Sequence, residues 1–242
     1  MFSKGWSQKV QSSYDQKDKD SGTYNNSEWV EKQKLRIENL ASELEVSKKR
    51  NHIIIDVVRK TRKDNIVILD FGGGLGLSYH PLKSSTNKNL DYNIVEVSKV
   101  VEAGRELYKN HNELSFYSNL IDVKKEIDIC YIRTSLQYVA SWKDTLEKIS
   151  KLLPSKIVLA DTAAGSIETF MTYQFWGKEK IPYWFISTQD IIEHMSSLGY
   201  NCVDKHEAQN IEKNKSFSGL KKYPEKNRIK TLINFTFEKN EN

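Results

Sequence analysis

The sequence predicts an α/β domain built on a mostly parallel β-sheet. Short, continuously apolar runs such as residues 66–71 and 157–161 are typical of strands that are buried on both faces. These runs alternate with helical stretches, and such alternation favours a parallel sheet with right-handed crossovers. A chain of 242 residues is long enough for one ordinary α/β domain with some decoration, or for two very small domains.

Composition and charge favour a cytoplasmic protein. Cys130 and Cys202 each lie in an apolar stretch, which argues against a disulfide scaffold and for a reducing compartment. No apolar run approaches the roughly 20 residues that cross a bilayer, and the first residues lack the apolar core of a signal peptide. The net charge is +5, but the lysines are scattered among acids, as on a solvated surface. The Lys, Asn and Ile bias is typical of an AT-rich bacterial genome.

The N-terminal part is predicted to be a polar segment followed by helices. Residues 1 to about 27 are rich in Ser, Lys, Asp and Asn, a loop-like composition. Ser27 is the expected N-cap of a helix over residues 28–49, and a second helical stretch covers about residues 51–62. We therefore separate an N-terminal extension, residues 1–50, from a domain over residues 51–242.

The remaining elements follow in order along the chain. The pattern predicts strands at residues 66–71, 92–97, 114–117, 127–132 and 157–161. It predicts helices at residues 78–82, 98–108, 142–152 and 188–198. Pro154 and Gly199 end the last two helices. Residues 200–205 and 231–237 alternate and are more polar, which suits an antiparallel edge hairpin, with residues 207–229 as a long loop between them.

A cluster of glycines follows the first strand directly. Asp70 precedes Gly72, Gly73, Gly74 and Gly76 in the pattern D-x-G-x-G-x-G. Ligands of open α/β sheets bind at the carboxyl ends of the strands, and glycines there let the main chain turn tightly and approach the ligand. A dinucleotide fingerprint would need a glycine at position 77, where the chain has Leu77.

An acid stands at the end of the next predicted strand. Glu96 stands about 20 residues after the glycine turn, where a carboxylate accepts hydrogen bonds from a ribose diol. The glycine pattern and this acid together resemble class I S-adenosylmethionine (SAM)-dependent methyltransferases, over about residues 50–240. That resemblance implies a Rossmann-like fold with a seven-stranded sheet of order 3-2-1-4-5-7-6, in which strand 7 is antiparallel.

The resemblance also implies a set of cofactor-binding residues. The glycine turn would contact the amino acid moiety of SAM, with Asp70 holding its ammonium group directly or through water. The segment at Asn119 would touch the adenine, and the segment before Tyr138 would line the methionine. The expected cofactor residues are Asp70, Gly72, Gly73, Gly74, Gly76, Glu96, Val97, Asn119, Leu120, Thr134, Ser135 and Gln137. S-adenosylhomocysteine (SAH) would be the product.

A narrower resemblance concerns the acceptor. Residues 71–76 with Tyr79, Gln174, residues 182–185 and residues 198–200 are similar to a bacterial methyltransferase family commonly encoded with surface-polysaccharide biosynthesis genes. Where that family has Asp-Arg-Thr, this chain has Asp161-Thr162-Ala163, so a contact made by that arginine is in doubt. The residues expected to bind substrate are Tyr79, Tyr138, Tyr173, Gln174 and Trp184.

Two residues are candidates for the general base that a hydroxyl acceptor would need. Asp161 ends a buried strand, and could point to the site or cap the next turn. His80 follows the glycine turn, and could deprotonate a sugar hydroxyl or be a helix-surface residue. Tyr173 and Gln174 could belong to an aromatic lid or to the core.

The sequence therefore predicts an O-methyltransferase acting on a glycan or a small hydroxylated metabolite. An NAD(P)-dependent oxidoreductase is the alternative enzyme, and the missing third glycine argues against it. A non-catalytic binding protein of the same fold is a third reading. Basic residues do not cluster and metal-ligand spacing is absent, so we expect neither a nucleic-acid partner nor a metal. The N-terminal helices could cover the site or form a homodimer contact.

Overall fold

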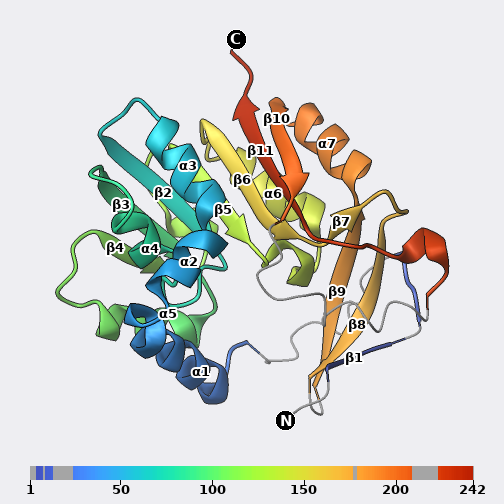
Figure 1. The fold of residues 1–242 in the computed structure, drawn as a ribbon, viewed down its shortest axis with the longest axis horizontal. Coiled ribbons are helices and arrows are strands. Elements are labelled where there is room, and N and C mark those ends of the chain that lie inside the picture. The colour runs from blue at the N-terminus through green and yellow to red at the C-terminus, as the bar shows by residue number, and fades with distance from the viewer. Residues whose placement is uncertain (1–3, 8, 13–23, 177–178, 209–222, 242) are drawn as a thin grey trace. The chain divides into compact units, whose positions relative to one another are not determined.

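The computed structural model divides into two compact units (Figure 1). The described residues are 4–7, 9–12, 24–176, 179–208 and 223–241. The glycine-turn unit consists of Tyr24–Arg133 and Lys151–Val158, and the hairpin unit of Met1–Thr23, Thr134–Ser150 and Leu159–Asn242. The boundary expected at residue 50 does not coincide with this division.

The seven-stranded sheet has the strand order β10-β11-β6-β5-β2-β3-β4. Its strands are β2 (Asn65–Phe71), β3 (Asn89–Val95), β4 (Leu114–Tyr117), β5 (Ile129–Arg133), β6 (Lys156–Thr162), β10 (Tyr200–Glu207) and β11 (Ile233–Lys239). Strand β2 pairs in parallel with β3 and β5, and β10 pairs antiparallel with β11. The predicted α/β class, mostly parallel sheet and edge hairpin are confirmed. Strand β3 begins and ends earlier than expected, so Glu96 lies just beyond it.

The core strands of the glycine-turn unit are apolar because both of their faces are covered. Ile68 and Leu69 in β2 are fully buried. The start of β5 is held by Asp128, whose Oδ2 accepts the Val67 N–H over 2.9 Å and whose own N–H donates to the Val67 carbonyl over 2.9 Å. These bonds fix the register of β5 against β2 near the amino ends of both strands.

Most helices of the glycine-turn unit differ in length or position from those that the sequence predicts. They are α1 (Ser27–Glu38), η2 (Asn39–Ala41), α2 (Leu44–Arg50), α3 (His52–Lys60), α4 (Tyr79–Lys83), α5 (Ser98–Leu107) and η3 (Leu120–Asp122). The single helix expected over residues 28–49 is wrong, because the chain forms a 3₁₀ turn after Glu38. The expected N-cap Ser27 is also wrong: Asn26 is the cap, and its side chain accepts the Trp29 N–H over 2.8 Å.

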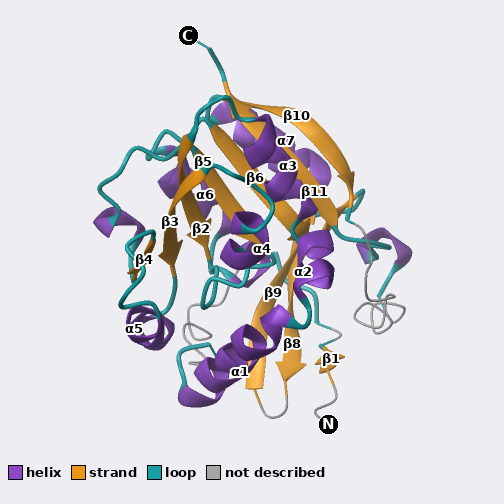
Figure 2. Ribbon diagram, turned by 60° about the vertical axis from the view of Figure 1, so that its left-hand side comes forward, coloured by secondary structure: helices purple, strands orange, loops and turns teal. Residues whose placement is uncertain are grey.

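The hairpin unit contains a second sheet that the sequence analysis did not predict. Its strand order is β1-β8-β9-β7, from β1 (Lys4–Trp6), β7 (Ala164–Gly165), β8 (Phe170–Trp176) and β9 (Glu179–Ser187). Figure 2 shows β8 and β9 as a long antiparallel pair, with Phe170 opposite Phe185. Aromatic and β-branched residues in these strands have high β-propensity, but Pro182 in β9 masks the pattern because proline is rare inside strands.

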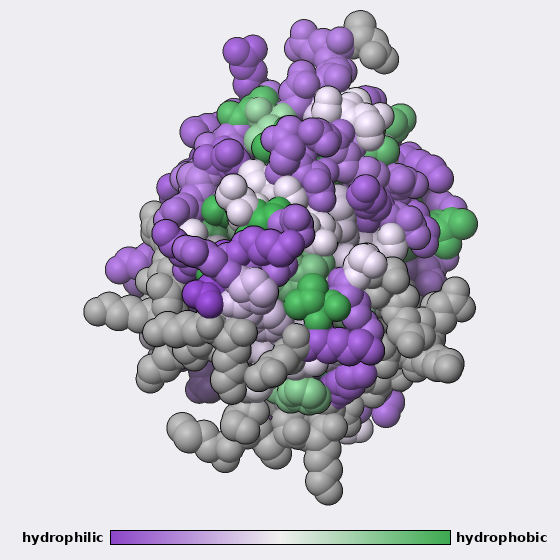
Figure 3. Space-filling model, turned by 90° about the vertical axis from the view of Figure 1, so that its right-hand side faces the viewer, coloured by the Kyte–Doolittle hydropathy of each residue, from purple (hydrophilic) through white to green (hydrophobic). Residues whose placement is uncertain are grey.

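The remaining helices of the hairpin unit are η4 (Leu136–Tyr138), α6 (Trp142–Ser150), α7 (Thr188–Ser197) and η6 (Glu225–Asn227). The loop expected over residues 207–229 lies largely outside the described residues. On the face drawn in Figure 3, hydrophobic residues form small, separate groups among hydrophilic ones. Within the described part of the chain, no helix is both long and apolar enough to span a membrane.

Candidate functional site

The glycine turn connects β2 to α4 through left-handed backbone conformations. Gly72, Gly74 and Gly76 have φ angles of 74°, 59° and 79°, which glycine adopts without the steric cost that other residues meet. The Gly72 N–H donates to the Val95 carbonyl over 2.9 Å, and the Gly76 N–H donates to the Gly73 carbonyl over 3.1 Å. The turn is therefore tied to the end of β3 and closed on itself.

Asp70 lies beneath this turn. A Cβ atom on Gly73 would stand 2.4 Å from Asp70 Oδ2, so only glycine lets the backbone cross the carboxylate so closely. Asp70 is 1% exposed, and its Oδ2 accepts a hydrogen bond from Tyr92 Oη over 2.7 Å. Burial raises the pKa of Asp70 to about 7; the Tyr92 hydrogen bond and the Arg133 charge oppose the rise, and the Glu96 charge adds to it. Asp70 thus supports the turn from within the protein.

Glu96 lies against the same turn from the neighbouring strand. Its Oε1 accepts the Gly74 N–H over 3.1 Å, and its Oε2 accepts the Val97 N–H over 2.8 Å. Burial raises the pKa of Glu96, while the two backbone hydrogen bonds act in the opposite direction. The structure therefore brings Glu96 together with Asp70 and the glycine turn, although about 20 residues separate Glu96 from the end of that turn in the sequence.

Asn119 and Leu120, two of the expected cofactor residues, follow the end of β4. Val95 pairs with Tyr117, and the Glu96 N–H donates to the Tyr117 carbonyl over 3.0 Å. The chain after β4 therefore runs beside the chain after β3. Asn119 is exposed, precedes η3, and donates from Nδ2 to Asp122 Oδ2 over 3.3 Å.

Helix α1 adds a residue that the sequence analysis missed. Gln33 is 4% exposed, and its Oε1 lies 2.9 Å from the position that a Cβ on Gly74 would take. The signal that could have identified it is a polar residue one turn after Val30, on the buried face of the helix.

In the hairpin unit, the residues after β5 and at the end of β6 have unusual backbone angles. Thr134 and Asp161 have φ angles of 55° and 51°, which are uncommon for residues other than glycine. The Thr134 N–H donates to the Ala160 carbonyl over 3.0 Å, and the Asp161 N–H donates to Asn234 Oδ1 over 2.8 Å. Strained residues of this kind persist where surrounding contacts hold them, commonly at functional sites.

The segment after Thr134 folds toward the same strand end. Ser135 precedes η4, whose Gln137 is buried and donates from Nε2 to the Asp161 carbonyl over 3.5 Å. Gln137 also hydrogen-bonds Tyr183, a buried tyrosine whose pKa is raised strongly by that burial. Gln137 is therefore the residue that connects η4, β6 and β9.

The expected substrate residues fall into two groups. Tyr138 Oη donates to Gln174 Oε1 over 3.3 Å, so these two lie together. Tyr173 is 2% exposed with the Lys180 ammonium 3.6 Å from its ring centroid, and Trp184 donates from Nε1 to the Val139 carbonyl over 3.0 Å. Burial of both aromatic rings supports the core alternative over a lid for this hairpin.

His80 and Tyr79 belong to a polar cluster of the glycine-turn unit. His80 Nε2 lies 2.8 Å from Tyr108 Oη, which donates to the Leu75 carbonyl over 3.1 Å. Burial lowers the pKa of His80, and the nearby His111 lowers it further. Tyr79 donates from Oη to Glu113 Oε1 over 3.0 Å. In the described part of the chain, these contacts join α4 to Tyr108 at the end of α5 and to Glu113 just before β4.

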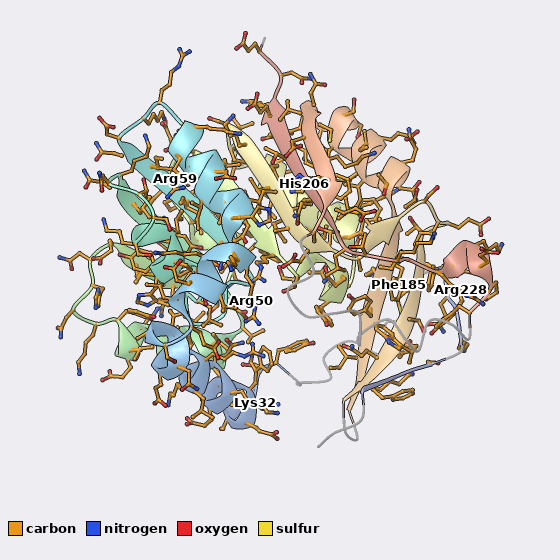
Figure 4. All side chains as sticks on the ribbon, viewed as in Figure 1. Lys32, Arg50, Arg59, Phe185, His206 and Arg228 are labelled. Atoms are coloured by element: carbon orange, nitrogen blue, oxygen red, sulfur yellow. The ribbon has the colours of Figure 1, made fainter. Side chains whose placement is uncertain are left out.

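A polar cavity of about 510 Å³ lies elsewhere in the glycine-turn unit. Arg59, labelled in Figure 4, lines it and donates from Nε to the Ser85 carbonyl over 2.9 Å. Lys88 also lines it and donates from Nζ to the Thr61 and Lys63 carbonyls. Both cations therefore hold backbone carbonyls, and none of the expected site residues lines this cavity.

Comparisons with known proteins agree with the geometry of the sheet. The sequence matches no protein-family model, and a search of curated proteins found no match. Among solved structures, the chain is similar to the 1,6-didemethyltoxoflavin-N1-methyltransferase of Burkholderia thailandensis, solved with bound 1,6-didemethyltoxoflavin and SAH, at a TM-score of 0.54 and 12% identity over 86% of this chain and 88% of that one. A SAM-dependent methyltransferase from Clostridium acetobutylicum gives a TM-score of 0.52 and 13% identity over 80% of this chain and 92% of that one.

The same fold also includes a protein of different chemistry. The [4+2]-cyclase SpnF matches with a TM-score of 0.51 and 12% identity, over 78% of this chain and 80% of that one. Fold alone does not specify a reaction. The comparisons show that this chain has the Rossmann-like fold of the class I SAM-dependent methyltransferases.

Proposed function

We propose that this protein is a SAM-dependent methyltransferase. The observation that carries the proposal is the convergence of the glycine turn with Glu96, whose Oε1 accepts the Gly74 N–H over 3.1 Å. Turn and acid occupy the carboxyl ends of adjacent parallel strands, where open α/β sheets bind nucleosides. SAH bound in a structural neighbour supports the same cofactor here.

The residues present fit this cofactor. The turn is a cradle that a side chain would fill, since a Cβ on Gly73 or Gly74 would meet Asp70 or Gln33 at 3 Å or less. Its backbone would hold the amino acid moiety. Glu96 would accept the ribose hydroxyls in charge-assisted hydrogen bonds, with Val97 beside it and the Asn119–Leu120 segment at the adenine.

Methyl transfer needs alignment more than acid–base chemistry. The cofactor supplies a methyl group on a positively charged sulfur. The protein has to hold the acceptor in line with that methyl and keep water out. Thr134, Ser135 and Gln137, which follow β5 directly, would line the methionine part of the cofactor.

For the acceptor, we propose a hydroxyl group on a glycan or a small hydroxylated metabolite. Asp161 would take the hydroxyl proton as general base, and Tyr138 and Gln174 would contact the acceptor. The 1,6-didemethyltoxoflavin bound to the Burkholderia enzyme supports a small acceptor, while the glycan part rests on the sequence resemblance alone. A cytoplasmic location and a homodimer remain predictions.

The test separates cofactor binding from transfer. Isothermal titration of SAH into the wild type should show one site. Glu96→Ala should weaken SAH binding. Glu106 is an exposed acid on α5, and the matched control Glu106→Ala should leave SAH binding unchanged. Radiolabelled methyl transfer to a panel of monosaccharides and nucleotide sugars then tests the acceptor class. A wild type that fails to bind SAH removes the proposal, whereas SAH binding without methyl transfer to any acceptor favours a binding protein or an enzyme that catalyses another reaction.

A further inference from the structure

Helix α1 is fixed directly over the glycine turn. Val30 of α1 packs with Leu75 of the turn and Val100 of α5 in one buried cluster. Just before the helix, Asn25 Oδ1 accepts the Lys99 N–H over 3.0 Å and the Ser98 hydroxyl hydrogen over 3.2 Å. The helix is thereby held to both the turn and the start of α5. Figure 4 labels Lys32 on this helix, next in sequence to Gln33.

Gln33 points from this helix onto the turn. Its side chain is 4% exposed, and its Oε1 stands 2.9 Å from the Cβ position of Gly74. Oε1 is buried and has no hydrogen-bond partner within the described part of the chain. A buried amide oxygen without a partner is costly, and this cost is offset when a ligand supplies the missing donor.

The neighbouring contacts identify that donor. Gly74 donates its N–H to Glu96 Oε1, so Gln33 and Glu96 lie against the same glycine. SAM and SAH have few donors: the ammonium group, the adenine amine and the two ribose hydroxyls. Since Glu96 is the acid expected at the ribose, the donor nearest to Gln33 is a ribose hydroxyl.

We propose that Gln33 is a cofactor-binding residue, and that its Oε1 accepts a hydrogen bond from a ribose hydroxyl of the bound nucleoside. The inference rests on the proposed function. Helix α1 would then form part of the cofactor site, and the ribose would be bound by α1 on one side and by the strand ends on the other.

The test compares Gln33→Met with a matched control, Gln189→Met. Methionine keeps the length of the side chain and replaces the amide with a thioether, which donates no hydrogen bond and accepts only weakly. Gln189 is exposed on α7 and bonds only a neighbouring side chain in the described structure, Glu193, over 2.8 Å. Two probes are titrated by calorimetry: SAH, and methylthioadenosine, which keeps the ribose and lacks the amino acid. Thermal unfolding is measured without ligand.

We expect Gln33→Met to lower the affinity for both probes by roughly tenfold, which is the effect of losing one hydrogen bond. Its melting temperature without ligand should stay equal or rise, because an unpartnered buried oxygen has been removed. Gln189→Met should bind both probes as the wild type does. Unchanged affinity of Gln33→Met, or a loss for SAH alone, overturns the proposal.

Two further outcomes also count against it. A lower melting temperature of Gln33→Met together with weaker binding would make Gln33 structural. Failure of methylthioadenosine to bind the wild type would remove the ribose contact. If the wild type binds neither probe, the proposed function itself fails, which is a different result from any change confined to the variant.

Discussion

Tyr92 donates its hydroxyl hydrogen to Asp70 Oδ2 over 2.7 Å, and both side chains are buried beneath the glycine turn. This bond stabilises the charged form of Asp70, against the burial that raises its pKa to about 7. The carboxylate that supports the turn therefore changes its charge close to neutral pH, and this has consequences for stability and for ligand binding.

Removing the hydroxyl in Tyr92→Phe should raise the pKa of Asp70 further, because a hydrogen bond to the charged form is lost. It should also cost roughly 1–2 kcal/mol of unfolding free energy at pH 8, where Asp70 is charged. Chemical denaturation measures this cost, and Tyr117→Phe at the partly exposed end of β4 is the control. Equal losses in both variants would show that the Tyr92–Asp70 bond contributes nothing specific.

The pH dependence of stability should carry the signature of Asp70. Its pKa is raised from 3.8 to about 7 on folding, so between these values the folded protein binds a proton that the unfolded chain has released. The contribution of Asp70 to the free energy of unfolding is therefore fully present below about pH 4. It falls as the pH rises and is lost above about pH 7.

Asp70→Asn should remove this slope. Unfolding free energies at pH 5 and pH 8 should differ less in Asp70→Asn than in the wild type, whereas Asp56→Asn, an exposed change on α3, should behave as the wild type does. A slope that survives in Asp70→Asn would contradict the assignment.

A glycine series separates steric contact from backbone strain. Gly73→Ala should destabilise the protein by roughly 1–3 kcal/mol, as overpacking does, and weaken SAH binding, because the new Cβ meets Asp70 at 2.4 Å. Gly199 has a φ of 84°, and a Cβ there would meet no other atom, so Gly199→Ala tests backbone strain alone. A Cβ on Gly5 would make only ordinary van der Waals contacts, so Gly5→Ala is the control. Thermal melts should rank Gly5→Ala as mildest, and only Gly73→Ala should lose affinity. Normal SAH binding by Gly73→Ala would show that the contact with Asp70 does not restrict the turn.

Asp161 should affect transfer without affecting cofactor affinity. If it is the general base for a hydroxyl acceptor, Asp161→Asn should lower the transfer rate by about 10²–10⁴-fold. The affinity for SAH should change by no more than about twofold, well short of the tenfold change that corresponds to 1.4 kcal/mol of binding free energy. Single-turnover assays measure the rate, with Asp144→Asn on the exposed start of α6 as control. A wild-type rate would exclude Asp161 as the base.

Asn234 offers an independent check on the same residue. It is 1% exposed and holds the Asp161 N–H through Oδ1. Asn234→Ala should leave that N–H without its acceptor, which costs roughly 1–3 kcal/mol of stability, and should lower transfer as well. Denaturation and transfer are measured together, since a stability loss with unchanged transfer would show that Asp161 does not need this support.

The sequence by itself determined the alternating strands and helices, the glycine turn and the acid after β3. These features are local, because buried parallel strands are apolar in consecutive positions and a tight turn needs glycines in a row. The sheet class and the edge hairpin follow from the same patterns. The prediction of one continuous helix over residues 28–49 is wrong, because the hydrophobic pattern carries no clear signal for the 3₁₀ turn after Glu38.

Only the tertiary structure decided which distant residues meet. Gln33 faces Gly74 across some 40 residues, and Asn234 holds Asp161 across 73. Such pairs leave no periodic trace, since each member is a single polar residue in an otherwise ordinary helix or strand. The second sheet escapes prediction for a related reason: β8 pairs with β1, near the other end of the chain, and the aromatic residues of β8 and β9 are equally consistent with a lid until their partner strands are known.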